Sequence, residues 1–167
     1  MHMEQGLVSL EAEVKPEWID GNGHMTFWAY VKLFGASADA YLRKAGIDEQ
    51  VQSGEACILH TSQSHVKFIK ECFVHEHVVI ELQLLGCDNK SIHIFQRMRD
   101  RDSGMLLAVE ESVKLNLIER RNLSFVERER LFHPKIMERL NELIKQNAKM
   151  PWPSEVGSRI FIPSKAL

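Results

Sequence analysis

Two patterns of apolar and polar positions follow one another in the first part of the chain. Residues 7–14 alternate between apolar and polar side chains, with Ser9 on the polar side, which predicts a strand with one buried face. Over residues 27–45 the apolar period becomes helical, and Gly46 follows as a stop signal. Small residues over 35–40 would let a sheet approach this helix closely. We therefore expect a central helix, buried on more than one side, whose sheet-facing positions are Tyr30, Leu33, Phe34, Ser37, Ala38, Tyr41 and Ala45.

The middle of the chain predicts four more strands. They are rich in β-branched and aliphatic residues and cover residues 57–68, 78–85, 92–98 and 106–118. The turn clusters between the last three are short. Parallel strands need long crossover connections, so these short turns predict antiparallel hairpins. A long helix followed by an antiparallel meander that wraps around it describes an α+β hotdog fold.

The C-terminal part predicts a helical extension. Ser124 and Glu127 have the spacing of a capping box, and Pro134 divides the helical region that runs to about Ala148. The prolines over 151–163 predict an extended tail. We expect one domain over residues 1–167, with a core at about 7–120 and a helix and tail at about 124–167.

Composition excludes several classes of function. The chain has 167 residues, 44% hydrophobic and 26% charged, with a net charge of −2. These values are typical of a globular protein and argue against a general nucleic-acid or membrane-surface binder. The apolar runs are too short to cross a bilayer, and the first residues do not read as a signal peptide. A soluble, cytoplasmic protein is the expectation.

Cysteines and histidines give no metal-binding pattern. The three cysteines have no CxxC spacing, and we expect reduced, mostly buried thiols. His75 and His77 flank Glu76, but neither HExxH nor Cys/His spacing supports a zinc site. No metal and no cofactor are therefore expected.

The segment Trp18-Ile19-Asp20-Gly21-Asn22-Gly23-His24-Met25-Thr26 has the strongest chemical signal. It places a carboxylate in a glycine-rich turn directly before the long helix, whose N-terminus offers unpaired amides and a positive dipole. A carboxylate beside amide donors can split an acyl group. In the alternative interpretation this is an ordinary capped turn, in which Asp20 or Asn22 satisfies the helix end.

The same segment resembles the active-site turn of acyl-CoA thioesterases of the 4-hydroxybenzoyl-CoA thioesterase-like family. Their pattern is an aspartate, a glycine three positions on, often a histidine next, and an aromatic ten positions after the aspartate; here these are Asp20, Gly23, His24 and Tyr30. The Asn-Gly-His-Met-Thr form, and the string from Leu85 to Phe95, are similar to the thioesterases associated with carnitine dehydrogenase, which act on betainyl-CoA. Gly21 and the apolar run 27–29 depart from that subgroup, which leaves the acyl group open.

The resemblance implies a site and an assembly. Asp20 would attack the thioester carbonyl or activate a water, with Asn22 and His24 as supporting catalytic candidates. Helix amides near Met25, Thr26, Phe27 and Trp28 would bind the substrate and stabilise the oxyanion. Such enzymes bind an acyl-CoA substrate across a dimer interface, so a homodimer or a dimer of dimers is expected.

Further residues are candidates for the pocket. Thr61 and His65 lie on a strand that is polar on both faces, and we expect them to line the pocket of a partner subunit. Coenzyme A phosphates favour basic side chains, here Lys67, Lys70 and Arg97. The trimethylammonium group of a betainyl thioester would favour aromatic rings, for which Trp18 and Trp28 are candidates and Tyr30 is expected to pack in the core.

Two other functions fit the same fold. A hydratase-type hotdog enzyme pairs an aspartate with a histidine in a similar turn, although its spacing is one residue longer and includes a proline that is missing here. A non-catalytic acyl-CoA-binding dimer would keep the helix and sheet without needing Asp20.

Overall fold

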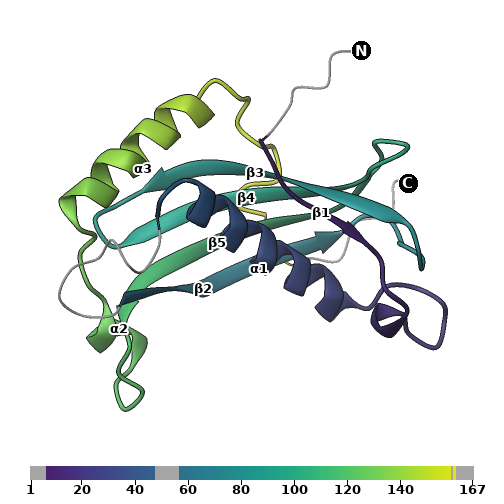
Figure 1. Ribbon diagram of the computed structural model, residues 1–167, viewed down its shortest axis with the longest axis horizontal. Coiled ribbons are helices and arrows are strands. Elements are labelled where there is room, and N and C mark those ends of the chain that lie inside the picture. The colour runs from purple at the N-terminus through teal and green to yellow at the C-terminus, as the bar shows by residue number, and fades with distance from the viewer. Residues whose placement is uncertain (1–6, 48–56, 159, 161–167) are drawn as a thin grey trace.

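The computed structural model describes residues 7–47, 57–158 and 160, and contains a five-stranded antiparallel sheet with a long helix against one face (Figure 1). The strand order β1-β3-β4-β5-β2 places the first two strands of the sequence at opposite edges of the sheet. The predicted α+β hotdog architecture is confirmed. The strands are β1 (Leu7–Glu13), β2 (Cys57–Phe68), β3 (His77–Cys87), β4 (Ser91–Asp100) and β5 (Leu106–Ile118).

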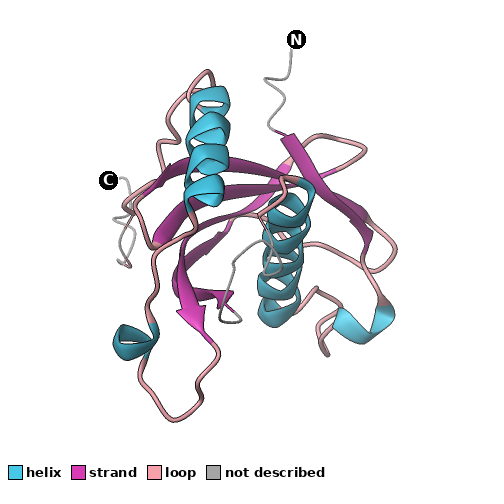
Figure 2. Ribbon diagram, turned by 60° about the vertical axis from the view of Figure 1, so that its left-hand side comes forward, coloured by secondary structure: helices cyan, strands magenta, loops and turns pink. Residues whose placement is uncertain are grey.

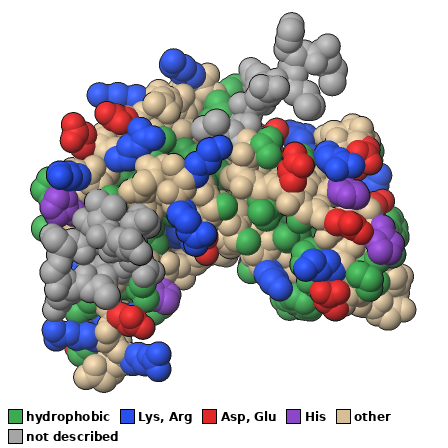
Figure 3. Space-filling model, in the orientation of Figure 1, with side chains coloured by type: hydrophobic (Ala, Val, Ile, Leu, Met, Phe, Trp, Pro, Cys, Tyr) green, Lys and Arg blue, Asp and Glu red, His purple; other side chains and the backbone are tan. Residues whose placement is uncertain are grey.

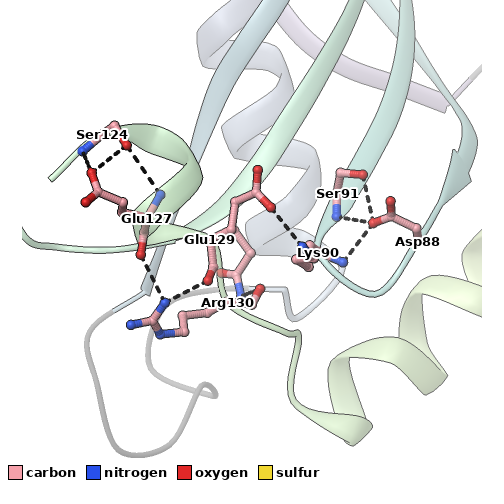
Figure 4. A network of polar contacts seen from close by, with 8 residues as sticks. Asp88, Lys90, Ser91, Ser124, Glu127, Glu129 and Arg130 are labelled. Carbon is pink, nitrogen blue, oxygen red and sulfur yellow. Dashed lines mark hydrogen bonds and ion pairs between the residues drawn. The ribbon is translucent and has the colours of Figure 1, made fainter.

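Aspartates close the two hairpins in the middle of the sheet. In the β3–β4 turn, Asp88 Oδ1 accepts hydrogen bonds from the backbone N–H of Lys90 and from the N–H and hydroxyl of Ser91 (Figure 4). These donors hold the pKa of Asp88 below its usual value. Asp100 accepts similarly from the backbone N–H and hydroxyl of Ser103 in the β4–β5 turn. The predicted antiparallel hairpins are confirmed, and both depend on side-chain acceptors in short turns.

The long helix α1 (Phe27–Lys44) has one buried face. Its buried residues are Ala29, Tyr30, Leu33, Phe34, Ser37, Ala38, Tyr41 and Leu42, which confirms the predicted helical period. The helix ends as expected, because Gly46 adopts a φ of +78° that other residues rarely adopt. The opposite face, including Lys32, Ala36 and Asp39, is exposed. The prediction of burial on more than one side is therefore wrong for the chain as described.

A β-bulge in β1 changes the predicted faces of that strand. The register with β3 shifts between Val8 and Leu10, and Ser9 turns its hydroxyl toward Ser37 of α1 and the carbonyl of Ile80. Val8, predicted on the apolar face, is exposed. A simple alternation does not reveal a bulge, because one extra residue inverts the faces on one side of it.

The C-terminal extension closes one end of the molecule. The short helix α2 (Phe125–Arg128) has the predicted capping box between Ser124 and Glu127, and Lys90 links the β3–β4 turn to Glu129 (Figure 4). Helix α3 (Pro134–Asn147) then packs beside the C-terminal half of α1 (Figures 1 and 2). Asn147 accepts from the N–H of Leu84 and donates to the Tyr41 hydroxyl, so the end of α3 is fixed to both sheet and helix.

The tail after α3 folds back onto the sheet. Pro153 is buried, residues 154–157 form a turn, and the Gly157 N–H donates to Glu111 Oε2 at 2.7 Å. The neighbouring Glu110 faces α1, because Gln96 Nε2 donates both to it and to the carbonyl of Phe34 in that helix. Successive side chains of a strand point to opposite faces, so Glu111 lies on the face of β5 away from α1. The expected extended tail is thus wrong up to residue 158, and Pro163 lies outside the described residues. No helix in the described part of the chain is both long and apolar enough to cross a membrane.

Candidate functional site

The turn before α1 is closed by its own backbone. A 3-10 helix, η1 (Pro16–Trp18), leads into it, and an isolated antiparallel bridge joins Ile19 to Met25. The Asp20 N–H donates to the carbonyl of His24 at 2.9 Å, and the Gly23 N–H donates to that of Asp20 at 3.1 Å. Gly23 has a φ of +84°, which explains why a glycine stands at this position. The turn therefore has a defined shape.

The Asp20 carboxylate is oriented within this turn and remains exposed. Its Oδ1 accepts hydrogen bonds from the backbone N–H groups of Asn22 (2.8 Å) and His24 (3.2 Å). No described residue donates a hydrogen bond to its Oδ2. One oxygen thus anchors the carboxylate, while the other can contact a ligand or water.

The start of α1 is left without a side-chain cap. Thr26 is the N-cap residue, but its hydroxyl donates to the Trp18 carbonyl at 3.0 Å and accepts nothing from the helix. Asp20 Oδ1 accepts from amides of the turn, and no side chain accepts a capping hydrogen bond from the start of α1. The interpretation of the segment as a turn in which Asp20 or Asn22 caps the helix is therefore wrong.

Two of the expected oxyanion donors are already engaged. The Met25 N–H donates to the carbonyl of Cys72, and the Thr26 N–H to that of Trp18, both at 2.8 Å. In the region that the structure describes, the first amides of α1 without a hydrogen-bond partner are those of Phe27 and Trp28. The predicted contribution of the Met25 and Thr26 amides is therefore wrong, since an amide that is already bonded cannot also stabilise an oxyanion. The predicted contribution of Phe27 and Trp28 stays a prediction.

A pocket of about 270 Å³ opens beside this helix start. Its wall comes from the turn, from α1 and from the segment that ends β2; the residues are His24, Met25, Phe27, Tyr30, Phe68, Ile69, Lys70 and Glu71. Tyr30 stacks edge-on against Phe68, and its hydroxyl donates to the carbonyl of Lys70. Burial raises the pKa of Tyr30. Tyr30 is therefore a packed wall residue, as expected, and stays a neutral phenol.

Exposed apolar side chains surround the pocket. Phe27 is 70% exposed and Phe68 49%, and Ile69, Phe73 and Val74 are exposed nearby in sequence. The space-filling view shows hydrophobic side chains at the surface over this end of α1 (Figure 3). The His24 ring lies edge-on to Phe73 at 5.4 Å. Apolar surface of this kind is typical of a binding site.

The other candidates lie apart from this pocket in the single chain. Thr61 accepts from Lys114 Nζ and is seven residues before Phe68 on β2, about 23 Å along the strand. His65 lines a separate pocket of about 250 Å³ with Glu111 on the other face of the sheet. Arg97 packs over the Phe95 ring. Lys67 is exposed and pairs with Val109 across β2 and β5. Of the three basic candidates, Lys70 alone lines the first pocket.

Neither expected tryptophan lines the pocket. Trp18 is buried in the core, and the Nζ atoms of Lys15 and Lys32 lie 5.5 and 5.6 Å from its ring centroid. Trp28 is 44% exposed but lies outside the pocket wall. Phe68, Ile69 and Glu71 were not predicted as pocket residues, because they come close to the turn only in the folded chain, where β2 returns beside α1. The one sequence feature that could have indicated them is the apolar pair Phe68 and Ile69 at the end of a predicted strand.

The cysteines and the histidine pair have structural surroundings. Cys72 and Cys87 are free thiols, and burial raises the pKa of Cys72 to about 12. The side chain of Cys57 lies outside the described residues. His75 contacts Glu13 at 2.6 Å and His77 approaches it at 4.0 Å. No group of three or more such side chains among the described residues is arranged to hold a metal ion.

Comparison with known proteins shows the family and the fold of this chain. The thioesterase-like superfamily model matches residues 14–160. A betainyl-CoA thioesterase from Pseudomonas aeruginosa is 31% identical over 161 residues, covering 96% of this chain and 98% of that protein. An L-carnitine dehydrogenase/betainyl-CoA thioesterase from Rhizobium meliloti is 30% identical over 90% of this chain, and the match spans 29% of that longer protein.

A solved structure has the same architecture. The chain superimposes on a Staphylococcus aureus protein in complex with CoA with a TM-score of 0.81 at 20% identity, covering 98% of this chain and 100% of that one. At that identity the likeness shows the fold. The family match extends over most of the chain, including the turn at Asp20 and the helix that follows it. The chain therefore belongs to the thioesterase-like superfamily and is a thioester hydrolase with a hotdog fold.

Proposed function

We propose that this protein hydrolyses acyl-CoA thioesters, with the Asp20 carboxylate and the Phe27 amide as the reacting pair. One observation carries the proposal: the Asp20 carboxylate accepts from the His24 N–H, and His24 and Phe27 both line the same pocket. Asp20 does not itself line that pocket, but its carboxylate is anchored to the amide of a residue that does. Its second oxygen has no donor among the described residues, and the Phe27 amide has no acceptor there.

The reaction needs little beyond these two groups. The Phe27 N–H polarises the carbonyl and stabilises the developing oxyanion, a contribution of about 3 kcal/mol for a well-placed donor. Asp20 either attacks the carbonyl, expelling the CoA thiolate and leaving an anhydride that water opens, or takes a proton from a water that attacks directly. Both routes consume one water and release a carboxylic acid and free CoA.

Asn22 and His24 have supporting roles in this proposal. Their backbone amides fix Asp20 Oδ1, which directs the other oxygen outward. The Asn22 side chain is exposed and available to orient the water, whereas the His24 ring forms part of the pocket wall against Phe73. The substrate-binding roles of Phe27 and Trp28 rest on their amides. Lys70 is the one of the three basic candidates that lines the pocket, and contact of any of the three with a CoA phosphate stays a prediction.

Betainyl-CoA is the substrate that we propose. The support is the 31% identity to a betainyl-CoA thioesterase over almost the whole chain. A hydratase is the weaker alternative, because the family match is to thioesterases. The same family match argues against a non-catalytic acyl-CoA binder, and the mutation of Asp20 tests this directly. No cofactor is expected besides the CoA thioester itself, and a cytoplasmic location stays a prediction.

We also infer a homodimer, or a dimer of dimers. Strand β2 stands at the edge of the sheet and is 12 residues long, and an uncovered edge of that length favours pairing with a second copy. Thr61 and His65 lie on this strand, so a partner's copies could approach the pocket even though the chain's own do not. Sedimentation at micromolar concentration tests the inference, and a monomer would contradict it.

A release assay for free thiol tests the proposed activity. Purified protein is offered a panel of short acyl-CoA thioesters that includes betainyl-CoA and its uncharged isostere 3,3-dimethylbutyryl-CoA. We expect catalytic release of CoA, with betainyl-CoA preferred over the isostere. Hydrolysis of both at the same rate would replace betainyl-CoA by a general short-chain substrate, and binding of CoA without any turnover would contradict the proposal.

A further inference from the structure

The pocket beside Asp20 contains one carboxylate that the proposed chemistry does not use. Glu71 follows the end of β2 and lines the pocket with the aromatic side chains of Phe27, Tyr30 and Phe68. It is exposed, and it forms no ion pair or hydrogen bond with any described residue. Its negative charge is therefore available to a ligand.

The neighbouring cation does not neutralise this charge. Lys70 also lines the pocket, but its Nζ lies 2.9 Å from the sulfur of Met105, near the β4–β5 turn. Its charge helps to hold the pKa of Asp100 below its usual value, after the larger effect of the hydrogen bond from Ser103. The charge of Glu71 contributes, after burial and Cys72, to the raised pKa of Tyr30. Lys70 thus reaches toward the hairpin, whereas Glu71 stays close to the aromatic wall.

The aromatic side chains complete a subsite for a positive charge. A quaternary ammonium group cannot donate a hydrogen bond, and aromatic faces together with a carboxylate are what hold it in proteins. The ammonium groups of Lys15 and Lys32 already lie over the Trp18 ring, and Trp28 lies outside the pocket. Neither tryptophan is therefore available in the pocket to bind a cationic acyl group. Phe27 and Phe68 are both largely exposed at the pocket and have faces available to a ligand.

We propose that Glu71, with Phe27 and Phe68, forms the subsite that selects thioesters whose acyl group carries a fixed positive charge. This proposal rests on the acyl-CoA hydrolase function proposed above and adds the residue that determines specificity. Glu71 attracts the cation as it leaves water, and the two rings replace its hydration shell. The Glu71 carboxylate and the two rings take no part in the reaction, for which Phe27 supplies only its backbone amide. The subsite therefore acts on the binding of one class of acyl group.

The test compares Glu71→Gln with the wild-type protein on two thioesters of the same shape, betainyl-CoA and 3,3-dimethylbutyryl-CoA. Glu71→Gln keeps the volume and removes the charge, and Glu71→Asp keeps the charge. Glu17→Gln is the matched control, because Glu17 is an exposed carboxylate beside the same turn that does not line the pocket.

We expect Glu71→Gln to lower kcat/KM for betainyl-CoA about tenfold, mainly through KM, and to leave the uncharged thioester within roughly twofold of wild type. Glu71→Asp should recover most of the loss, and Glu17→Gln should change neither substrate. An equal effect of Glu71→Gln on both thioesters, or no effect on either, would overturn the subsite while leaving the hydrolase function intact. If the wild-type protein hydrolysed neither thioester, the hydrolase function would fail and the subsite with it.

Discussion

The two ends of helix α1 lie in opposite environments. At the C-terminal end, α3 covers the helix and the sheet, and side chains such as Leu140 and Ile136 are almost fully buried. At the N-terminal end nothing in the described chain covers Phe27, which is 70% exposed beside the pocket. The same helix is therefore buried at the end that supports the fold (the sealed end) and exposed at the end where the substrate is proposed to bind (the open end).

The two ends of α1 also differ in how far their polar groups are hydrogen-bonded. At the sealed end, Asn147 satisfies both the N–H of Leu84 and the hydroxyl of Tyr41. At the open end, the amides of Phe27 and Trp28 have no partner among the described residues. Every helix start has such amides, and water or a ligand can satisfy them when they are exposed. The contrast supports the proposal that the substrate binds at the open end.

The largest effect that would sharpen this contrast comes from removing the Phe27 amide. Phe27→Pro deletes the N–H at a helix position that proline tolerates, and Thr26 already has the extended φ and ψ that a following proline requires. We expect kcat to fall about 100-fold to 1,000-fold, as for the loss of one oxyanion donor.

Phe27→Ala is the matched control for that variant, because it removes the ring and keeps the amide. It should lower kcat far less than Phe27→Pro, although KM is expected to rise. Steady-state kinetics on folded protein, checked by circular dichroism, separate the two. Equal kcat values for the proline and alanine variants would remove the amide from the mechanism.

A substitution at the sealed end of α1 should lower the free energy of unfolding and leave kcat unchanged. Leu140→Ala leaves a cavity in the cluster between α3 and α1, and we expect unfolding free energy to fall by about 2–5 kcal/mol. Leu131 is 64% exposed, so Leu131→Ala is the control and should cost less than about 0.5 kcal/mol. Urea denaturation measures both. A loss of kcat in folded Leu140→Ala protein would show that the two ends are not independent.

A smaller effect is expected at the cap of α2. Ser124→Ala removes the acceptor for the Glu127 N–H and should lower unfolding free energy by about 1 kcal/mol. Ser124→Asp keeps an acceptor there and should retain most of the stability. Thermal unfolding followed by circular dichroism measures the difference, and an unchanged midpoint in Ser124→Ala would mean that the capping box adds nothing to the sealed end.

Regular patterns made the fold predictable from the sequence. The β-branched and aliphatic content of β2 and β5 and the helical period of α1 gave the correct bounds within one or two residues, because each is a local property of the sequence. The bulge at Ser9 and the folded-back tail were not predicted, since both depend on contacts with distant segments such as Glu111. A local pattern cannot report such contacts.

The site was predictable only as far as its local turn. Asp20, Gly23 and the helix start follow one another in sequence, so their arrangement could be anticipated. The amide assignment failed at Met25 and Thr26 because their partners, the carbonyls of Cys72 and Trp18, are set by tertiary structure. The role expected of Trp18 failed for a similar reason, since Lys15 and Lys32 lie over its ring in the folded chain.

The measurement that tests the central claim most directly is hydrolysis by Asp20→Asn. Asparagine keeps the size of the side chain and an oxygen that can accept from the Asn22 and His24 amides, but it is neither a base nor an effective nucleophile. Thiol release and the binding of CoA by calorimetry are measured on the same preparation. Asp102→Asn is the control, because Asp102 is an exposed carboxylate that does not line the pocket. The account predicts a fall in kcat of about 100-fold to 10,000-fold with CoA affinity unchanged. Wild-type turnover in folded Asp20→Asn protein would contradict it.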